Sequence, residues 1–324
     1  MMEERTRYFT PPIPNGWFQI ASSDEVKPGE AKPLRYFGKD LVIWRSEAGE
    51  LSVLDAFCPH LGAHLGHGGK VKGESIECPF HAWQFGTKGQ CTAVPYAKHV
   101  PRKASLKPWH IKELAGLVMC WHHAEGEPPL WGIPDRIPEL ETDEWTDFEL
   151  REWKIRTRNQ EMAENAVDSA HFHYLHGCTN MPQSEATVDG HKLRVFSGAG
   201  MSTPRGEVAG TIESLNYGFG LSVVRFKGLV ETLNVATTTP IDEDNVHLRF
   251  NFSIKKLGGA DTTRGVGAAF IAELKRQLEQ DIPIWENKVQ YERPLLCDGD
   301  GPIGIFRRWC TQFYTWPEEE QAAE

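Results

Sequence analysis

The sequence lacks any uninterrupted apolar stretch long enough to cross a membrane. A spanning helix needs about 20 mostly apolar residues, and the densest candidate, residues 266–278, is broken by charged side chains. The chain also starts without the apolar core of a signal peptide, because Met1-Met2 is followed by Glu3, Glu4 and Arg5. These absences predict a cytoplasmic protein with no transmembrane segment.

Basic residues and cysteine are also scarce. Asp and Glu outnumber Lys and Arg by 45 to 35, which gives a net charge of −10. Phosphate backbones repel such a chain, so nucleic-acid binding would need a local basic patch, and none is evident in the sequence. Seven scattered cysteines are too few to crosslink 324 residues. This favours a reducing compartment and leaves thiols free to act as ligands.

The apolar pattern divides the chain into two domains. Residues 1–127 contain short strand-like runs separated by glycine, proline and aspartate turns, and they predict an all-β domain. Residues 128–140 are rich in proline and predict a stiff connection. Residues 141–324 predict an α+β domain, with a strand over 148–158, a helix over 161–174 and antiparallel strands within 208–254.

A long helix is expected near the C-terminus, beginning at residues 261–263. Its apolar stripe, at spacings of three and four, consists of Phe270, Leu274, Leu278, Asp281 and Trp285. Pro283 cannot donate a helical hydrogen bond and predicts a kink beside the carboxylate of Asp281. Either a metal compensates the buried charge of Asp281, or the helix frays at Pro283 and exposes it.

Two short motifs each combine one cysteine with one histidine. They are Cys58-Pro59-His60 and Cys78-Pro79-Phe80-His81, separated by seventeen residues. Two thiolates and two imidazoles can bind one zinc ion, or a [2Fe–2S] cluster with two histidines on one iron. Structural zinc sites usually begin with paired cysteines, so one Cys and one His in each loop favour the cluster. The nearby His64 and His67 are expected on the loop surface.

Three histidines lie within six residues at the end of the predicted helix 161–174. His171 and His176 are five residues apart, about 140° around an ideal helix, so both reach one metal only if the helix loosens between them. Gly177 is a natural helix stop. His173 and His176, three apart, are an equally good pair, and spacing does not decide between the pairs.

The two cysteine–histidine loops resemble the Rieske motif, and the chain as a whole resembles the terminal oxygenase (α) subunit of the Rieske non-haem iron oxygenases. The resemblance implies that a Rieske [2Fe–2S] cluster is bound by Cys58, His60, Cys78 and His81. It also implies an N-terminal Rieske domain followed by a catalytic domain of the helix-grip type. Members of the family assemble as homotrimers or hexamers.

The segment Asn165-x2-Asp168-x2-His171-x4-His176 resembles the mononuclear iron motif of the same family. The resemblance implies a non-haem Fe(II) bound by His171, His176 and Asp281, with Asn165 hydrogen-bonding beside the iron. It further implies that Asp168 meets a cluster histidine, His81, across a subunit boundary and links the two metal centres.

The segments from residue 281 to residue 314 are most similar to the steroid and sterol branch, which includes 3-ketosteroid 9α-hydroxylase and the cholesterol 7-desaturases. The resemblance implies a monooxygenase that uses O2 and NAD(P)H electrons, delivered by a ferredoxin or by a flavin/iron–sulfur reductase. It would hydroxylate, desaturate or demethylate an apolar steroid or sterol-like substrate. Two alternatives stay open: a Rieske oxygenase for a small aromatic or methylated compound, and a Rieske electron carrier without oxygen chemistry.

No nicotinamide site is expected in the chain itself. Gly299-x-Gly301-x2-Gly304 matches the dinucleotide fingerprint, but a helical pattern precedes it where a strand is required, and Pro302 interrupts it. Electrons therefore have to come from a partner protein.

Overall fold

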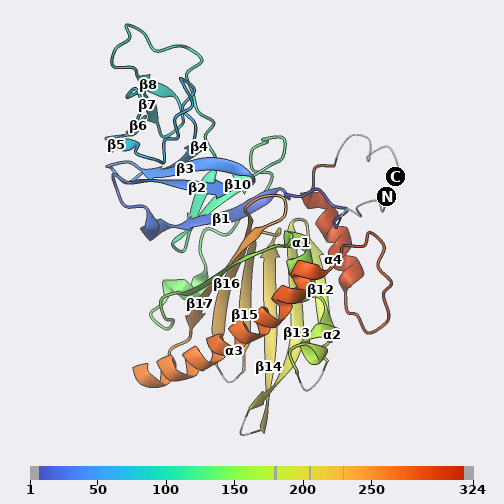
Figure 1. The fold of residues 1–324 in the computed structure, drawn as a ribbon. Coiled ribbons are helices and arrows are strands. Elements are labelled where there is room, and N and C mark those ends of the chain that lie inside the picture. The colour runs from blue at the N-terminus through green and yellow to red at the C-terminus, as the bar shows by residue number, and fades with distance from the viewer. Residues whose placement is uncertain (1–6, 179–180, 204–205, 229, 317–324) are drawn as a thin grey trace. The chain divides into compact units, whose positions relative to one another are not determined.

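The structure, a computed structural model, describes residues 7–178, 181–203, 206–228 and 230–316 (Figure 1). The chain divides into a first unit, Phe18–Leu130, and a second unit that combines Met1–Trp17 with Trp131–Glu324. Among the described residues, no helix has the length and apolar character needed to cross a membrane.

The N-terminal segment belongs to the second unit, although the sequence analysis grouped it with the first domain. The backbone N–H of Asn15 donates to the carbonyl of Phe313 at 2.7 Å. The indole N–H of Trp17 donates to the carbonyl of Trp131 at 2.8 Å. These contacts join residues far apart in the sequence, and no local pattern predicts them.

The first unit contains three small sheets, with strand orders β1-β10-β9, β2-β3-β4 and β5-β6-β7-β8. Its extended character follows from short apolar runs that end at turns, as the sequence predicts. Its elements are β1 (Gly16–Ser22), the 3₁₀ turn η1 (Ser23–Glu25), β2 (Ala31–Tyr36), β3 (Lys39–Arg45), β4 (Leu51–Asp55), β5 (Lys70–Lys72), β6 (Ser75–Glu77), β7 (Gln84–Gly86), β8 (Cys91–Ala93), β9 (Ile111–Leu114) and β10 (Leu117–His122).

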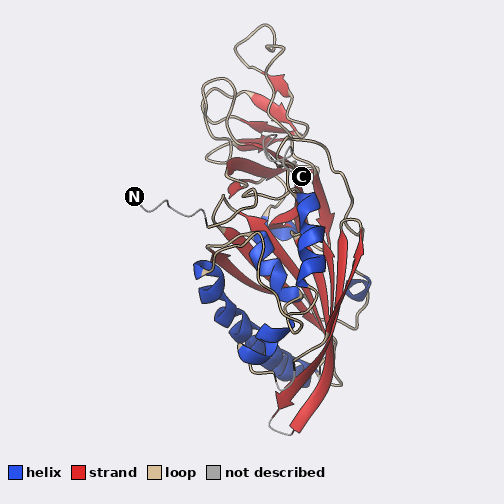
Figure 2. Cartoon of the chain, turned by 90° about the vertical axis from the view of Figure 1, so that its right-hand side faces the viewer, coloured by secondary structure: helices blue, strands red, loops and turns tan. Residues whose placement is uncertain are grey.

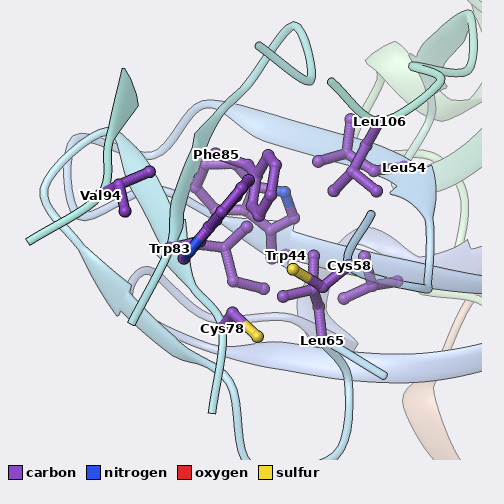
Figure 3. Packing of buried hydrophobic residues seen from close by; sticks show 11 residues of the cluster. Trp44, Leu54, Cys58, Leu65, Cys78, Trp83, Phe85, Val94 and Leu106 are labelled. Carbon is purple, nitrogen blue, oxygen red and sulfur yellow. The ribbon is translucent and has the colours of Figure 1, made fainter. Parts of the chain in front are cut away.

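The core of the first unit packs directly beneath the two cysteine–histidine loops. Trp44 from β3, Leu54 from β4 and Phe85 from β7 are fully buried there. Cys58 and Cys78 belong to the same cluster of buried residues (Figure 3). The loops therefore rest on close-packed side chains, which restricts their movement.

The second unit is built on a seven-stranded antiparallel sheet of order β11-β17-β16-β15-β14-β13-β12. Its elements are the 3₁₀ turn η2 (Pro138–Glu141), β11 (Glu149–Ile155), α1 (Asn159–Ala163), the 3₁₀ turn η3 (Glu164–Ala166), α2 (Ser169–Tyr174), β12 (Ser184–Asp189), β13 (Lys192–Thr203), β14 (Gly206–Tyr217), β15 (Leu221–Lys227), β16 (Thr232–Pro240), β17 (Val246–Ile254), α3 (Ala260–Asn287), α4 (Ile303–Cys310) and the 3₁₀ turn η4 (Thr311–Phe313).

One face of this sheet is covered by helices, with α3 running across it and α1 and α4 beside α3 (Figures 1 and 2). On the covered face the register aligns Val195, Ser214, Val224 and Asn234 in one row across four strands. Side chains directly opposite each other share a face of a sheet. The row therefore lies between the sheet and the helices.

The predicted helix over residues 161–174 is wrong as one element. The structure has α1, then η3, then a break at Asp168, then α2. Asp168 takes an extended backbone conformation, and its carboxylate accepts the backbone N–H groups of Ala170 at 3.0 Å and His171 at 3.3 Å. An aspartate that caps a new helix competes with continuation of the old one.

The remaining elements follow the sequence with two differences. The strands expected within 208–254 are present as β14 to β17, and α3 begins at residue 260, within one residue of the predicted start. The sequence analysis did not predict β12 and β13, whose residues are largely small or polar. Pro283 lies inside α3, which continues to Asn287, so the alternative of a helix that frays at the proline is wrong.

Candidate metal centres and substrate cavity

The two cysteine–histidine loops fold into matching turns. In the first, the N–H of Cys58 donates to Ala63 and the N–H of Gly62 donates back to Cys58, both at 2.9 Å. In the second, the N–H of Cys78 donates to Trp83 at 2.7 Å and the N–H of Ala82 donates to Cys78 at 3.0 Å. Gly62 and Ala82 occupy equivalent positions with φ of 76° and 58°. Each of the two turns therefore carries one cysteine and one histidine.

The donor set of these loops fits a Rieske cluster. Cys58 and Cys78 are buried, and the rings of His60 and His81 lie 4.7 Å apart between centroids. Each histidine has a buried Nδ1 atom without a hydrogen-bond partner among the described residues. Burial, together with the neighbouring Cys78 thiol, raises the pKa of Cys58 to about 11. Two thiols and two unpartnered imidazole nitrogens so close together are explained if they bind a metal cluster.

One side of this site is supported by an aromatic contact. The ring of His60 stacks on Trp83 at 4.7 Å with an interplanar angle of 8°. The indole N–H of Trp83 donates to the hydroxyl of Tyr96 at 2.7 Å. Trp83 therefore fixes the plane of His60 and connects it to the loop after β8. His64 and His67 lie outside this arrangement, and the Nδ1 of His64 accepts the backbone N–H of Gly66.

The second candidate centre is formed by α2 and α3. One ligand atom from each of His171, His176 and Asp281 lies within 4.8 Å of the others. The Nε2 of His176 is 3.5 Å from a carboxylate oxygen of Asp281, which is only 7% exposed. Two imidazoles and one carboxylate are the donor set of non-haem iron sites with open positions, so the residues fit a mononuclear Fe(II).

The helix does loosen between the two histidines. The helix α2 ends at Tyr174, and the N–H of His176 donates to the carbonyl of His171, five residues back, at 3.3 Å. Gly177 follows with a φ of 75° and ends the turn, as predicted. The ring of His173 is engaged elsewhere, because its Nδ1 lies 2.6 Å from the carbonyl of Cys178. Among the described residues, the ligand atoms that lie close to Asp281 come from His171 and His176, and His173 is not part of that group.

Hydrogen bonds orient all three side chains. The Nδ1 of His171 lies 2.6 Å from the carbonyl of Asp168, and the Nδ1 of His176 lies 3.1 Å from the Oε1 of Gln280. Both rings thus direct Nε2 away from these partners. Asn165 donates to Asp281 at 3.1 Å.

Trp285 supports the carboxylate of Asp281 indirectly, through Asn165. The indole of Trp285 donates to the Oδ1 of Asn165 at 3.3 Å. The sequence analysis predicted a role for Asn165 beside the iron but missed Gln280 and Trp285 as partners. Their contacts depend on the packing of α3 against α1 and α2.

Electrostatics distinguish the two histidines. Burial lowers the pKa of His171 below its ordinary value, against the opposing charges of Asp168 and Asp281. Burial acts in the same direction on His176, but the hydrogen bond and charge of Asp281 outweigh it and raise the pKa. Asp281 is therefore the buried negative charge that a divalent cation would balance.

A cavity of about 290 Å³ adjoins these three residues, between the helices and the covered face of the sheet. This is close to the lower end of the range for pockets that bury drug-sized molecules, about 300 Å³ upward. Most of its lining is aliphatic or aromatic, contributed by β13 to β17 and by α3 and α4. Apart from Asp281, the charged residues that line it are Lys227 and Glu273. The cavity suits an apolar ligand.

Two side chains that line the cavity have a buried polar atom without a partner among the described residues. These atoms are the Oδ1 of Asn234 and the indole nitrogen of Trp309. The hydroxyl of Thr232, two residues before Asn234 on the same face of β16, is also unpartnered. Buried polar groups normally have partners, so the Oδ1 of Asn234 is available to accept a hydrogen bond from a ligand hydroxyl, and the indole N–H of Trp309 is available to donate one to a ligand oxygen.

Comparison with known proteins decides the family. Residues 16–107 match the Rieske [2Fe–2S] domain, and residues 120–314 match the 3-ketosteroid 9α-hydroxylase C-terminal domain. The second match alone spans more than half of the chain. The chain belongs to the Rieske oxygenases of the 3-ketosteroid 9α-hydroxylase family.

Individual relatives of this Rieske oxygenase agree with that assignment. It is 34% identical to a 3-ketosteroid-9-alpha-monooxygenase oxygenase component of Rhodococcus rhodochrous, over 96% of this chain and 84% of the relative. It is 32% identical to a cholesterol 7-desaturase of Ciona intestinalis, over 94% of this chain and 70% of the relative. Dicamba monooxygenase shares the fold, with a TM-score of 0.74 and 16% identity over 97% of this chain and 100% of the other.

These findings confirm several sequence predictions. The family with its steroid and sterol branch, the α+β class with an N-terminal Rieske domain, and the monooxygenase class of enzyme are confirmed. The predicted cofactors, a Rieske cluster, non-haem iron and O2 with reductase-delivered electrons, are those of oxygenase components in this family. The aromatic-substrate and electron-carrier alternatives are not favoured. The roles of single site residues stay predictions.

Proposed function

We propose that this Rieske oxygenase oxidises a steroid or sterol-like substrate at the centre formed by His171, His176 and Asp281. The observation that carries the proposal is the apolar cavity that ends at these three residues. Relatives named for 3-ketosteroids and for cholesterol support the substrate class.

The shape of the cavity supports a long, rigid substrate. Its lining extends along α3 from Phe270 to Asp281, and eleven residues of α-helix rise about 16 Å. Opposite α3, Val224 and Phe226 from β15 and Ala236 from β16 continue the apolar wall. A fused polycyclic hydrocarbon fills such a space without the entropy cost of ordering a flexible chain. The Oδ1 of Asn234 would accept a hydrogen bond from a substrate hydroxyl, and the indole N–H of Trp309 would donate one to a substrate oxygen.

In this proposal Cys58, His60, Cys78 and His81 bind the [2Fe–2S] cluster, and His171, His176 and Asp281 bind Fe(II). The cluster supplies single electrons, and the iron activates O2 for insertion into a C–H bond or for desaturation or demethylation. Hydroxylating one C–H bond with one O2 takes two further electrons, which a reductase passes on from NAD(P)H. The chain contributes ligands for both centres but no nicotinamide site.

The protein's own groups hold this arrangement. Asn165, positioned by Trp285, fixes the carboxylate of Asp281. The carbonyl of Asp168 and the side chain of Gln280 hold the two histidine rings with Nε2 facing Asp281. The apolar lining excludes water, which strengthens electrostatic interactions at the centre.

Several finer statements belong to the same proposal. The Rieske domain lies within residues 1–127, whose first seventeen residues group with the catalytic unit, the proline-rich connection spans 128–140, and the catalytic domain spans 141–324. The enzyme works in the cytoplasm, in lipid metabolism, as a homotrimer or hexamer. In that assembly Asp168 of one subunit meets His81 of the partner subunit and links a cluster to a neighbouring iron. A ferredoxin or a flavin/iron–sulfur reductase delivers the electrons.

A substrate screen tests the proposal. The iron-loaded protein and a surrogate reductase are supplied with NAD(P)H and with steroids, sterols or small aromatic acids, and O2 consumption and product mass are measured. We expect O2 uptake coupled to a product 16 mass units heavier after hydroxylation, 2 lighter after desaturation or 14 lighter after demethylation, for at least one steroid or sterol. Coupled turnover of aromatic acids, with no response to any steroid or sterol, would contradict the substrate class.

A further inference from the structure

The first unit contains a long stretch without Asp or Glu side chains. The net negative charge of the whole chain hides this feature. From Cys78 to Lys112, with both ends included, there are six Lys and Arg residues and no Asp or Glu. The sequence analysis found no basic patch because the surplus of acid elsewhere dominates. The first unit has 13 Lys and Arg against 12 Asp and Glu, whereas the rest of the chain has 22 against 33.

The basic residues of this stretch gather on one exposed loop after β8. Every residue from 95 to 103, here called the basic loop, is exposed. It carries Lys98, His99, Arg102 and Lys103. In the part of the chain that the structure describes, Lys98, Arg102 and Lys103 form no ion pair with a carboxylate. Their charges are therefore available to a partner.

The basic loop is connected to a ligand of the cluster. Tyr96, which is 62% exposed, accepts the indole N–H of Trp83 at 2.7 Å. Trp83 in turn stacks on His60 at 4.7 Å. A protein bound at this loop would thus lie against the side of the cluster site that His60 and Trp83 form.

The two cysteine–histidine loops themselves expose side chains of a different chemistry. Leu61 beside His60 and Phe80 beside His81 are 64% and 60% exposed, and Phe57 is 51% exposed. Permanent subunit interfaces are rich in apolar residues, whereas charged surfaces speed transient encounters. A cluster that receives electrons from one protein and passes them to another centre needs two such faces.

We propose that the basic loop is the docking surface for an acidic electron-carrier protein that reduces the cluster. This inference rests on the proposed function, because it assumes a cluster at Cys58, His60, Cys78 and His81. In each encounter one electron leaves the reduced carrier and enters the oxidised cluster, so the carrier is oxidised as the cluster is reduced, and two encounters serve one turnover. The acidic remainder of the chain repels the carrier and steers it to the loop.

The test uses charge reversal in the holoprotein. The variant Lys98→Glu/Arg102→Glu/Lys103→Glu is compared with Lys27→Glu/Arg264→Glu/Lys275→Glu, which makes the same change in net charge at exposed positions outside the loop. The probe is a plant-type [2Fe–2S] ferredoxin with an acidic surface, a stronger reductant than a Rieske centre. Reduction of the cluster is followed by stopped-flow absorbance, and binding of the oxidised ferredoxin is followed by calorimetry.

At low ionic strength we expect the second-order rate constant of cluster reduction to fall about 30-fold or more in the loop variant and less than about threefold in the control. The difference should shrink as salt is added, and ferredoxin affinity should weaken in parallel. Reduction by dithionite and the oligomeric state should be unchanged. The charge-preserving variant Lys98→Arg/Arg102→Lys/Lys103→Arg should keep the fast rate.

Equal losses in the loop variant and the control would overturn the proposal, since a general charge effect would then suffice. An unchanged rate in the loop variant would overturn it as well. Dissociation of the assembly in the loop variant would assign the loop to a subunit interface instead. Failure of the chemically reduced wild-type protein to oxidise any steroid would overturn the proposed function but leave the docking result intact.

Discussion

At the scale of single residues, the sequence already contained the donors of both centres. Paired cysteine–histidine motifs and a carboxylate on an apolar stripe can be recognised because such residues are unusual at those positions. Spacing left His173 and His176 as an equal alternative, because only the folded chain shows that His171 and His176, and not His173, lie beside Asp281. No pattern in the sequence indicates that Gln280, which lies on the helix α3, would contact His176.

The first prediction concerns Asp281. Replacing Asp281 with Ala removes the buried carboxylate from the group of three, so iron should drop from about three per chain to about two and turnover should be lost. The visible spectrum of the cluster should persist. Metal analysis and absorbance measure both, with Glu279→Ala on the exposed face of the same helix as the control. Normal hydroxylation by the Asp281→Ala protein would show that Asp281 is not a ligand.

The second prediction concerns Asn234 at the cavity wall. Its Oδ1 is buried without a partner, so Asn234→Leu should leave the stability of the substrate-free protein unchanged or slightly raised. The KM for a steroid with a hydroxyl at the bound end, which can donate to this Oδ1, should rise about two- to tenfold, the value of one hydrogen bond. A substrate analogue without that hydroxyl should bind both proteins alike. A marked fall in thermal stability would contradict the idea of an unsatisfied amide.

At the scale of elements, long periodic segments were predictable and local interruptions were not. The stripe of α3 is clear because four apolar residues, Phe270, Leu274, Leu278 and Trp285, recur at helical spacing. The break before α2 was missed because residues 161–174 have an unbroken helical pattern, and only the capping bonds of Asp168 show where a new helix begins. The strands β12 and β13 were missed because their side chains alternate weakly.

The third prediction concerns the loop before α4. Gly301 has a φ of 77°, and a Cβ there would lie 2.5 Å from the carbonyl oxygen of Val167, beside the start of α2. Gly301→Ala should therefore lower the thermal midpoint and reduce iron occupancy. At Gly299 a Cβ would meet its nearest neighbour, Met181, at 3.8 Å, so Gly299→Ala is the matched control. Calorimetry and metal analysis compare them, and equal behaviour of the two variants would argue against this close approach.

At the scale of the whole molecule, the motifs were enough to predict the protein family. Which distant segments of the chain pack together could be seen only in the structure. Residues 7–17 pack with residues near 290 and 313, contacts that no local pattern encodes. The basic loop was equally hidden, since the three positive charges of Lys98, Arg102 and Lys103 count for little against a total of −10 until the structure shows them exposed together.

The last prediction depends on assembly and concerns Asp168. Its Oδ1 caps α2 by accepting two backbone N–H groups, and its side chain remains one-third exposed. Asparagine caps helices as well as aspartate does, so Asp168→Asn removes the charge while preserving the helix and the orientation of His171. If Asp168 also meets His81 of the partner subunit, the charge couples the two imidazoles, and its loss should slow electron delivery by about 100-fold or more while both metal sites stay loaded.

Single-turnover stopped-flow on pre-reduced, substrate-bound protein separates the two roles of Asp168. Slow oxidation of the cluster at normal iron content is expected for Asp168→Asn, whereas Asp168→Ala, which also removes the cap, should lose iron as well. Protein diluted to monomers should fail to sustain turnover, because the cluster and iron that exchange electrons would then belong to separated chains. A wild-type rate of cluster oxidation in Asp168→Asn, or full activity in a monomer, would leave Asp168 with the capping role alone.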